Sequence, residues 1–175
     1  MTHTVDLVPH LDAGDRKQWR GDQDERPLSE LGRRQARALA DTLAAEPVDA
    51  LYSSPALRCR QSLEPLAERL GLTITVLPEL RESQQEGWMQ GATGGAHAAG
   101  RMLVALAQIR DAQPEGRAIA CSHGDVIPAL AAFLVAAHGL RGVAELERRG
   151  QWYRVRFAEA GVSAELQEAP QGFPS

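Results

Sequence analysis

The sequence predicts a three-layer α/β/α sandwich with a mostly parallel central sheet. Two observations lead to this fold class: short apolar runs alternate with longer amphipathic runs, and aromatic residues make up only 5% of the chain. Alternating strands and helices are typical of a parallel sheet with helices on both faces. The length of 175 residues fits one domain, which we expect to span residues 1–168, with residues 169–175 as a disordered tail.

Five short runs are expected to form strands. The first four are mostly apolar, as in strands that are covered on both faces, whereas the fifth alternates apolar and polar residues. That alternation favours a place at the edge of the sheet, where the fifth run can pair with residues 163–167 across the turn "EAG". The five runs are residues 4–8, 49–53, 73–77, 117–121 and 152–157.

Four amphipathic runs between the strands are expected to form helices. The first begins after Ser29, a good N-cap because its hydroxyl can accept a hydrogen bond from a free amide of the first turn, and its leucines fall on one stripe. The connections over residues 12–27 and 82–95 are long for a compact domain, which makes both candidates for a functional role.

The second helix is predicted to begin at Pro55 and to end at Gly71, because proline suits a first helical position and glycine suits a C-cap. Pro65 lies inside this run and is expected to kink or split the helix. The third and fourth helices are predicted over residues 96–112 and 124–139.

Composition excludes several classes of protein. The formal net charge of −4 and the lack of a long basic run argue against a nucleic acid or a membrane surface as partner. Cys59 and Cys121 fit neither a metal-binding nor a disulfide spacing, which indicates a reducing compartment. No signal-peptide pattern and no apolar run of about 18 residues is present. We therefore expect a cytoplasmic protein, whose oligomeric state the sequence leaves open.

Chemistry-bearing residues follow four of the predicted strands. The first strand ends at His10, and the second is followed by "SSP" and, one turn into the next helix, by Arg58. The third leads to Arg81 and Glu82, and the fourth ends in "CSHGD", which carries His123. In a sheet of this kind ligands bind beyond the carboxyl ends of the strands. These side chains are therefore expected to line one anion-sized pocket.

Three motifs at these junctions resemble the histidine phosphatase superfamily, which has the phosphoglycerate mutase-like fold. They are "RPLSELGRRQA" (26–36), "YSSPALRCRQSLEPLAERLG" (52–71) and "CSHGDVIPAL" (121–130). The resemblance extends from residue 5 to about residue 137. It is greatest to the compact phosphohistidine-phosphatase branch, including versions fused behind pyrophosphohydrolase domains.

The resemblance implies a role for each matching residue. His10 matches the nucleophile, a neutral imidazole that attacks phosphorus and becomes a phosphohistidine. Arg58 matches the arginine that binds the phosphoryl oxygens through two N–H groups. His123 matches the second histidine, which stabilises the charge as the phosphoryl group moves. The resemblance implies neither a metal nor a cofactor for this chemistry.

The acid that protonates the leaving oxygen is the least defined of the implied roles. Glu82 in "LRE" is our choice, with Glu79 and Glu86 as alternatives. The implied function is that of a metal-independent phosphohydrolase. Its substrate is expected to be a small phosphomonoester, a small-molecule anion, or a protein that carries phosphohistidine.

The chain departs from the family at the nucleophile. The family motif reads Arg-His-Gly or Arg-His-Ala, whereas this chain reads Pro9-His10-Leu11. Proline carries no charge and no N–H group, so the phosphate contact of that arginine is lost. Loss of one such donor costs about 3–4 kcal/mol of transition-state stabilisation.

Two interpretations of this departure remain open. The adjoining loop carries Arg16, Lys17 and Arg20, and we assign Arg16 to the phosphate site as the replacement cation. The alternative is a diverged member that has lost or exchanged phosphatase activity. Such a protein binds or transforms a non-phosphorylated substrate, for example a carboxylate, in the same pocket.

Overall fold

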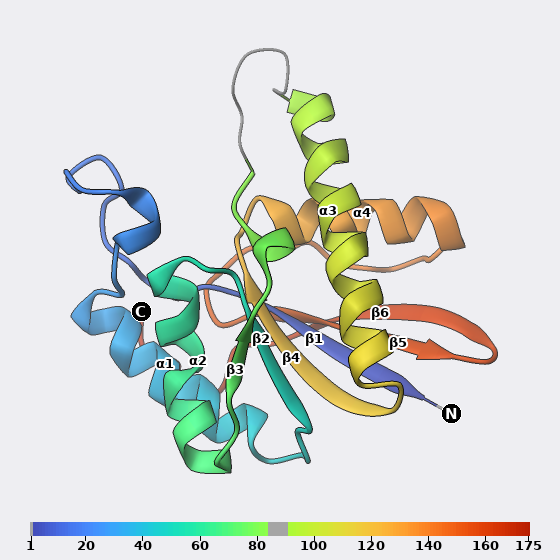
Figure 1. Cartoon of the computed structure of the whole chain (residues 1–175), viewed down its shortest axis with the longest axis horizontal. Helices are drawn as coiled ribbons and strands as arrows, with labels where there is room; N and C mark the ends of the chain where they lie inside the picture. The colour runs from blue at the N-terminus through green and yellow to red at the C-terminus, as the bar shows by residue number, and fades with distance from the viewer. Residues whose placement is uncertain (1, 84–90) are drawn as a thin grey trace.

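The computed structural model describes residues 2–83 and 91–175. A six-stranded sheet has the order β3-β2-β4-β1-β5-β6 and lies between two layers of helices (Figure 1). The first four strands pair in parallel, and β5 and β6 are antiparallel to their neighbours. The predicted sandwich with a mostly parallel sheet is confirmed. The strands are β1 (His3–Pro9), β2 (Ala50–Ser53), β3 (Ile74–Val76), β4 (Gly116–Ser122), β5 (Trp152–Ala158) and β6 (Gly161–Gln167).

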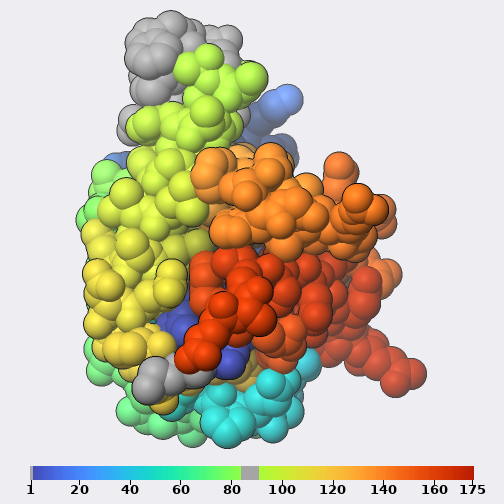
Figure 2. All heavy atoms as spheres, turned by 90° about the vertical axis from the view of Figure 1, so that its right-hand side faces the viewer, coloured from blue at the N-terminus to red at the C-terminus, as the bar shows by residue number. Residues whose placement is uncertain are grey.

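The helices cover opposite faces of the sheet in pairs. Because side chains alternate along a strand, Val5 and Leu7 of β1 pack beneath α3 and α4, and Val8 packs beneath α1 and α2. Seen from the side of β6, α3, α4 and the β5–β6 hairpin form one continuous surface (Figure 2). The helices are α1 (Glu30–Leu43), α2 (Leu57–Leu70), α3 (Gly91–Ala112) and α4 (Val126–His138), with short 3-10 turns η1 (Gln23–Glu25) and η2 (Pro78–Leu80).

Two predicted helix caps are confirmed. The Ser29 hydroxyl accepts a hydrogen bond from the Gly32 amide at 3.0 Å, which satisfies one of the free donors at the start of α1. Gly71 ends α2 in the left-handed conformation, with φ of 66°. Local side-chain chemistry therefore sets these two boundaries.

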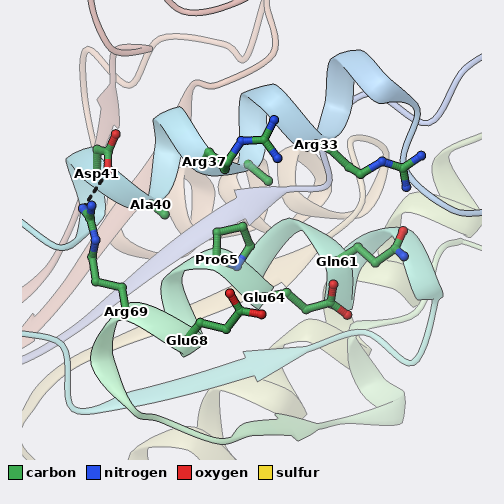
Figure 3. A pocket seen from close by; sticks show the side chains of 10 residues that line it. Arg33, Arg37, Ala40, Asp41, Gln61, Glu64, Pro65, Glu68 and Arg69 are labelled. Atoms are coloured by element: carbon green, nitrogen blue, oxygen red, sulfur yellow. Dashed lines mark ion pairs between the residues drawn. The ribbon is translucent and has the colours of Figure 1, made fainter.

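The predicted start of α2 at Pro55 and the predicted split at Pro65 are wrong. The helix begins at Leu57, after Pro55, and it runs through Pro65 without a break. Leu63 and Leu66 on its buried face pack into the core, and this packing outweighs the hydrogen bond that a proline removes from a helix. Pro65 lines a groove between α1 and α2 (Figure 3).

The third helix begins at Gly91, so the C-terminal part of the predicted connection 82–95 is helical. Glycines at its start lower the intrinsic preference for helix, which is why the sequence predicts a start at residue 96. Burial of Gly94 and Ala98 against the core extends the helix backwards. Residues 84–90 of this connection lie outside the described residues.

The fifth strand is not at the edge of the sheet. β5 pairs with β1 on one side and with β6 on the other, so β6 is the edge strand. The hairpin predicted across "EAG" is present, and it moves the edge outwards by one strand. The alternation of apolar and polar residues in β5 has another origin, because Arg154 on the polar face is buried in an ionic cluster.

Residues 169–175 lie beside α1, which differs from the disordered tail expected from composition (Figure 1). Gln35 of α1 donates a hydrogen bond to the Pro174 carbonyl at 2.8 Å. Phe173 packs against the core layer of α1 and α2 and against Gly150, where an added Cβ would lie 2.7 Å from its ring. An aromatic side chain buries enough apolar area to hold a short segment in place.

Gly32→Ala is expected to destabilise the protein, because an added Cβ would lie 1.9 Å from the Asp12 carbonyl oxygen. The loop after β1 would have to move away from α1, and we expect the free energy of unfolding to fall by about 1–3 kcal/mol in urea titrations. Gly100→Ala in α3 is the matched control, because a Cβ there meets nothing within 4 Å. It should raise stability by about 0.5–1 kcal/mol. Equal stability of Gly32→Ala and wild type would contradict this close approach.

None of the helices in the described part of the chain has the length and hydropathy that a membrane span requires.

Candidate active site

His10 and His123 meet at the carboxyl edge of the sheet. They directly follow β1 and β4, which are neighbouring parallel strands, so both side chains start from the same end of the sheet. Their ring centroids lie 5.4 Å apart, with the planes at 71°. The proximity of the two histidines that the sequence predicted is present in the fold.

The His10 ring is held in one tautomer by its own backbone. Nδ1 lies 2.8 Å from the Leu11 carbonyl oxygen, which can only accept a hydrogen bond, so Nδ1 carries the proton and Nε2 has a free lone pair. Burial, together with the positive charges of Arg58, Arg149 and Arg26, lowers the pKa of His10 to about 4, although the Leu11 contact raises it. The imidazole is therefore neutral near pH 7.

Arg58 is fully buried in the first turn of α2 and contacts three groups. Its Nη2 lies 3.2 Å from His123 Nδ1 and 3.1 Å from Glu82 Oε2, and its Nη1 donates to the Gln23 carbonyl at 2.6 Å. Its Nε is buried and has no hydrogen-bond partner among the described residues. One buried donor of this guanidinium is thus unused.

The second histidine is neutral as well. Burial, and after it the neighbouring His10 and Arg58, lower the pKa of His123 to about 2. Its Nε2 lies 2.9 Å from Ser54 Oγ and 3.6 Å from Cys59 Sγ. Sequence reasoning missed Ser54, although the residue lies in the "SSP" segment that follows β2.

Glu82 and Arg16 are also brought to this group. One Glu82 oxygen contacts Arg58 Nη2, and the other lies 2.9 Å from Arg16 Nη1. Arg16 comes from the loop after β1, and its side chain is 60% exposed. Glu79 lies in η2, and in the described part of the chain no hydrogen bond joins it to either histidine. Glu86, the other alternative for the acid, lies outside the described residues.

Two further arginines surround the site, and sequence reasoning did not assign either. Arg26 is buried and donates to the Ala13 carbonyl at 2.8 Å; burial and the neighbouring positive charge of Arg58 lower its pKa. Arg149 Nη1 lies 3.3 Å from the His10 carbonyl oxygen. Arg26 opens the motif "RPLSELG", and that position could have marked it as a site residue. Arg149 belongs to no motif, so no sequence signal indicated its place. The surroundings of His10 are therefore positively charged.

Pro9 is compatible with its place at the end of β1. The His10 amide donates to the Ser122 carbonyl at 2.9 Å on the β4 side, and pairing with β5 ends at Leu7 and Tyr153. Because successive amides of a strand point to opposite sides, the missing N–H of Pro9 falls beyond the last pair with β5. The proline therefore removes a charge from the site without breaking the sheet.

A separate hollow of about 680 Å³ lies between α1 and α2 and includes none of the site residues (Figure 3). Arg69 of α2 and Asp41 of α1 form an ion pair across it, at 2.6 Å. No group of three side chains suited to hold a metal ion occurs in residues 2–83 and 91–175. The chemistry-bearing side chains gather at the carboxyl edge of the sheet.

Comparison with known families and proteins agrees with this arrangement. The model of the histidine phosphatase superfamily (branch 1) matches residues 12–94. This chain belongs to the histidine phosphatase superfamily. The matched stretch includes Arg16, Arg58 and Glu82, begins two residues after His10 and ends before His123. The family resemblance predicted from the sequence is confirmed.

One curated relative is the 8-oxo-(d)GTP phosphatase of Mycolicibacterium smegmatis, which is 36% identical over 129 residues. The alignment covers 74% of this chain but only 36% of the relative, so the chain spans about a third of that protein's length.

Several solved structures share the fold. YhfR of Bacillus stearothermophilus superposes with a TM-score of 0.77 at 18% identity, over 96% of this chain and 98% of YhfR. The protein histidine phosphatase SixA, solved with tungstate, gives a TM-score of 0.68 at 21% identity, over 97% and 98% of the two chains. These likenesses confirm the predicted phosphoglycerate mutase-like fold.

Proposed function

We propose that this superfamily member is a phosphohydrolase that acts through a phosphohistidine on His10. The observation that carries the proposal is the neutral His10 ring, whose Nδ1–H is bound to the Leu11 carbonyl while Nε2 keeps its lone pair beside His123. A histidine needs this protonation state to attack phosphorus. The substrate is a small phosphomonoester or a protein that carries phosphohistidine.

The reaction proceeds in two steps that use the same residues. His10 Nε2 attacks phosphorus, the bond from phosphorus to the leaving oxygen breaks, and Glu82 gives that oxygen a proton. Water then attacks phospho-His10, Glu82 takes its proton, and inorganic phosphate leaves with His10 neutral again. Arg58 and His123 bind the oxygens that carry the charge in both steps.

The contacts of Glu82 and Arg58 support this division of roles. Arg58 already holds a carboxylate on Nη2 and keeps a buried, unused Nε–H, so its guanidinium can bind two anionic oxygens side by side. A phosphoryl group that takes the place of Glu82 on Nη2 frees that carboxylate for the leaving oxygen. Arg16 is bound to Glu82 at 2.9 Å and supplies the cation that Pro9 lacks.

A phosphatase assay tests the proposal. Wild type is expected to release phosphate from an aryl phosphate and from acetyl phosphate; nucleoside phosphates belong in the panel because one relative is named an 8-oxo-(d)GTP phosphatase. Pro9→Arg restores a donor to the phosphoryl group and should raise kcat/KM by about 10²-fold. Arg16→Gln should lower it. Phosphate release by wild type that does not exceed the enzyme-free blank would contradict the proposal.

A carboxylate substrate is the second candidate, and one contact favours it: Arg58 binds the carboxylate of Glu82. Together with Pro9, that contact suits a site that exchanged phosphate for a less charged ligand. This candidate predicts that wild type has no phosphatase activity and that only Pro9→Arg releases phosphate. Measurable phosphate release by wild type would rule it out.

The pH dependence of kcat/KM follows from the His10 environment. Because the pKa of His10 is lowered to about 4, Nε2 stays unprotonated down to that pH and the acid limb should fall near pH 4. Folding sets a limit: the unfolded chain protonates its histidines from about pH 6.5 downwards, so stability declines as pH falls. Circular dichroism should therefore be recorded at each pH to show that the protein is folded where the rate is measured. An acid limb near pH 6.5 in folded protein would contradict the buried, neutral His10.

A further inference from the structure

The two ring nitrogens of His123 have partners of different kinds. Nδ1 lies 3.2 Å from Arg58 Nη2, and Nε2 lies 2.9 Å from Ser54 Oγ. An arginine guanidinium has donors only, so Nδ1 must accept. The proton of the neutral ring is therefore on Nε2, and Ser54 Oγ accepts it.

Burial and backbone hydrogen bonds fix the position of Ser54 beside His123. It is fully buried, and its amide donates to the Cys121 carbonyl of β4 at 2.9 Å. Its Oγ also accepts from the Ala56 amide at 3.3 Å, so both lone pairs of the hydroxyl oxygen point at donors. The neighbouring Ser53 donates from its own Oγ to the Ser54 carbonyl at 2.8 Å.

We propose that Ser54 is a positioning residue that fixes His123 in the Nε2–H tautomer and so presents Nδ1 to the phosphoryl group. The inference rests on the proposed function and adds a residue to it. With Nε2–H bound to Ser54, Nδ1 is the nitrogen that can accept from Arg58 in the resting site. When a monoanionic phosphoryl group binds to Arg58, the same nitrogen can accept the proton of its P–OH group and then donate it back in a hydrogen bond to that phosphoryl oxygen.

Without the Ser54 oxygen, the described partner left near Nε2 is Cys59 Sγ at 3.6 Å, a much weaker acceptor. The ring is then free to take the other tautomer, in which Nδ1–H faces the donors of Arg58. A wrong tautomer or orientation of an active-site histidine lowers kcat more than it changes KM. We expect Ser54→Ala to lower kcat by about 10- to 100-fold.

The test compares Ser54→Ala with Ser53→Ala, which removes the same hydroxyl from a neighbouring, equally buried serine that does not contact His123. Nitrogen-15 NMR of the imidazole rings in the resting protein reports the tautomer, with the His123 signal assigned by its loss in His123→Gln. Wild type and Ser53→Ala should show protonated Nε2 and bare Nδ1. Ser54→Ala should show a tautomer mixture and the fall in kcat, and Ser54→Thr, which keeps the oxygen, should retain both.

The outcomes separate this proposal from the proposed function. A wild-type spectrum with Nδ1–H, or an Ser54→Ala variant with unchanged tautomer and kcat, overturns the role of Ser54 even if the enzyme is active. An Nε2–H spectrum in a wild type without phosphatase activity supports the role of Ser54 and counts against the proposed function alone. The wild-type spectrum decides the matter if Ser54→Ala fails to fold.

Discussion

His10→Ala is expected to lower phosphatase kcat/KM by at least about 10³-fold. The variant removes the only group proposed to form the covalent intermediate, and the water that remains is a much weaker nucleophile than an imidazole. His138→Ala is the matched control, because that histidine is exposed at the end of α4, away from the site. It should keep the wild-type rate.

Trapping the intermediate gives an independent measurement of the same prediction. Brief reaction with a ³²P-labelled substrate should label wild type with an acid-labile, alkali-stable phosphate, the behaviour of a phosphorus–nitrogen bond. His10→Ala should take up no label. Label on another residue, or a His10→Ala variant that turns over at the wild-type rate, would show that a different nucleophile is used.

Asp6→Asn is expected to destabilise the fold by about 3–5 kcal/mol in urea titrations at pH 7. Asp6 is fully buried in β1, and its carboxylate accepts hydrogen bonds from Arg117 Nε at 2.9 Å and from Arg154 Nε at 2.8 Å. Hydrogen bonding to Asp6 raises the pKa of Arg154. The amide cannot neutralise the two buried guanidinium groups, so the charge of Arg117 is left uncompensated and Arg154 keeps only its exposed partner Glu46.

Glu46→Gln is the control for this cluster. Glu46 pairs with the same Arg154 at 3.0 Å, but its side chain is 58% exposed. Solvent screens such a pair, and its loss should cost less than about 1 kcal/mol. If the two variants lose similar stability, the burial of Asp6 does not control the energy of the cluster.

Local sequence signals predicted helix boundaries correctly where the residue type has a single well-defined capping role. Ser29 begins α1 and Gly71 ends α2 as predicted, because a capping hydroxyl and a left-handed glycine act within a single turn. Pro65 shows the limit of such signals: its effect on the helix depends on how much apolar surface the rest of α2 buries. The position of β5 likewise depends on which strand pairs with its far side.

The sequence by itself determined the alternation of strands and helices and the residues that follow each strand, since both depend on hydrophobic period and chain order. Only the tertiary structure decided how those residues meet. Arg58 reaches His123 across 65 positions of the chain, and Ser54 reaches it across 69. Burial, which no local pattern encodes, makes both imidazoles neutral. Protonation state and tautomer follow from these distant neighbours, and with them the chemistry that the site can perform.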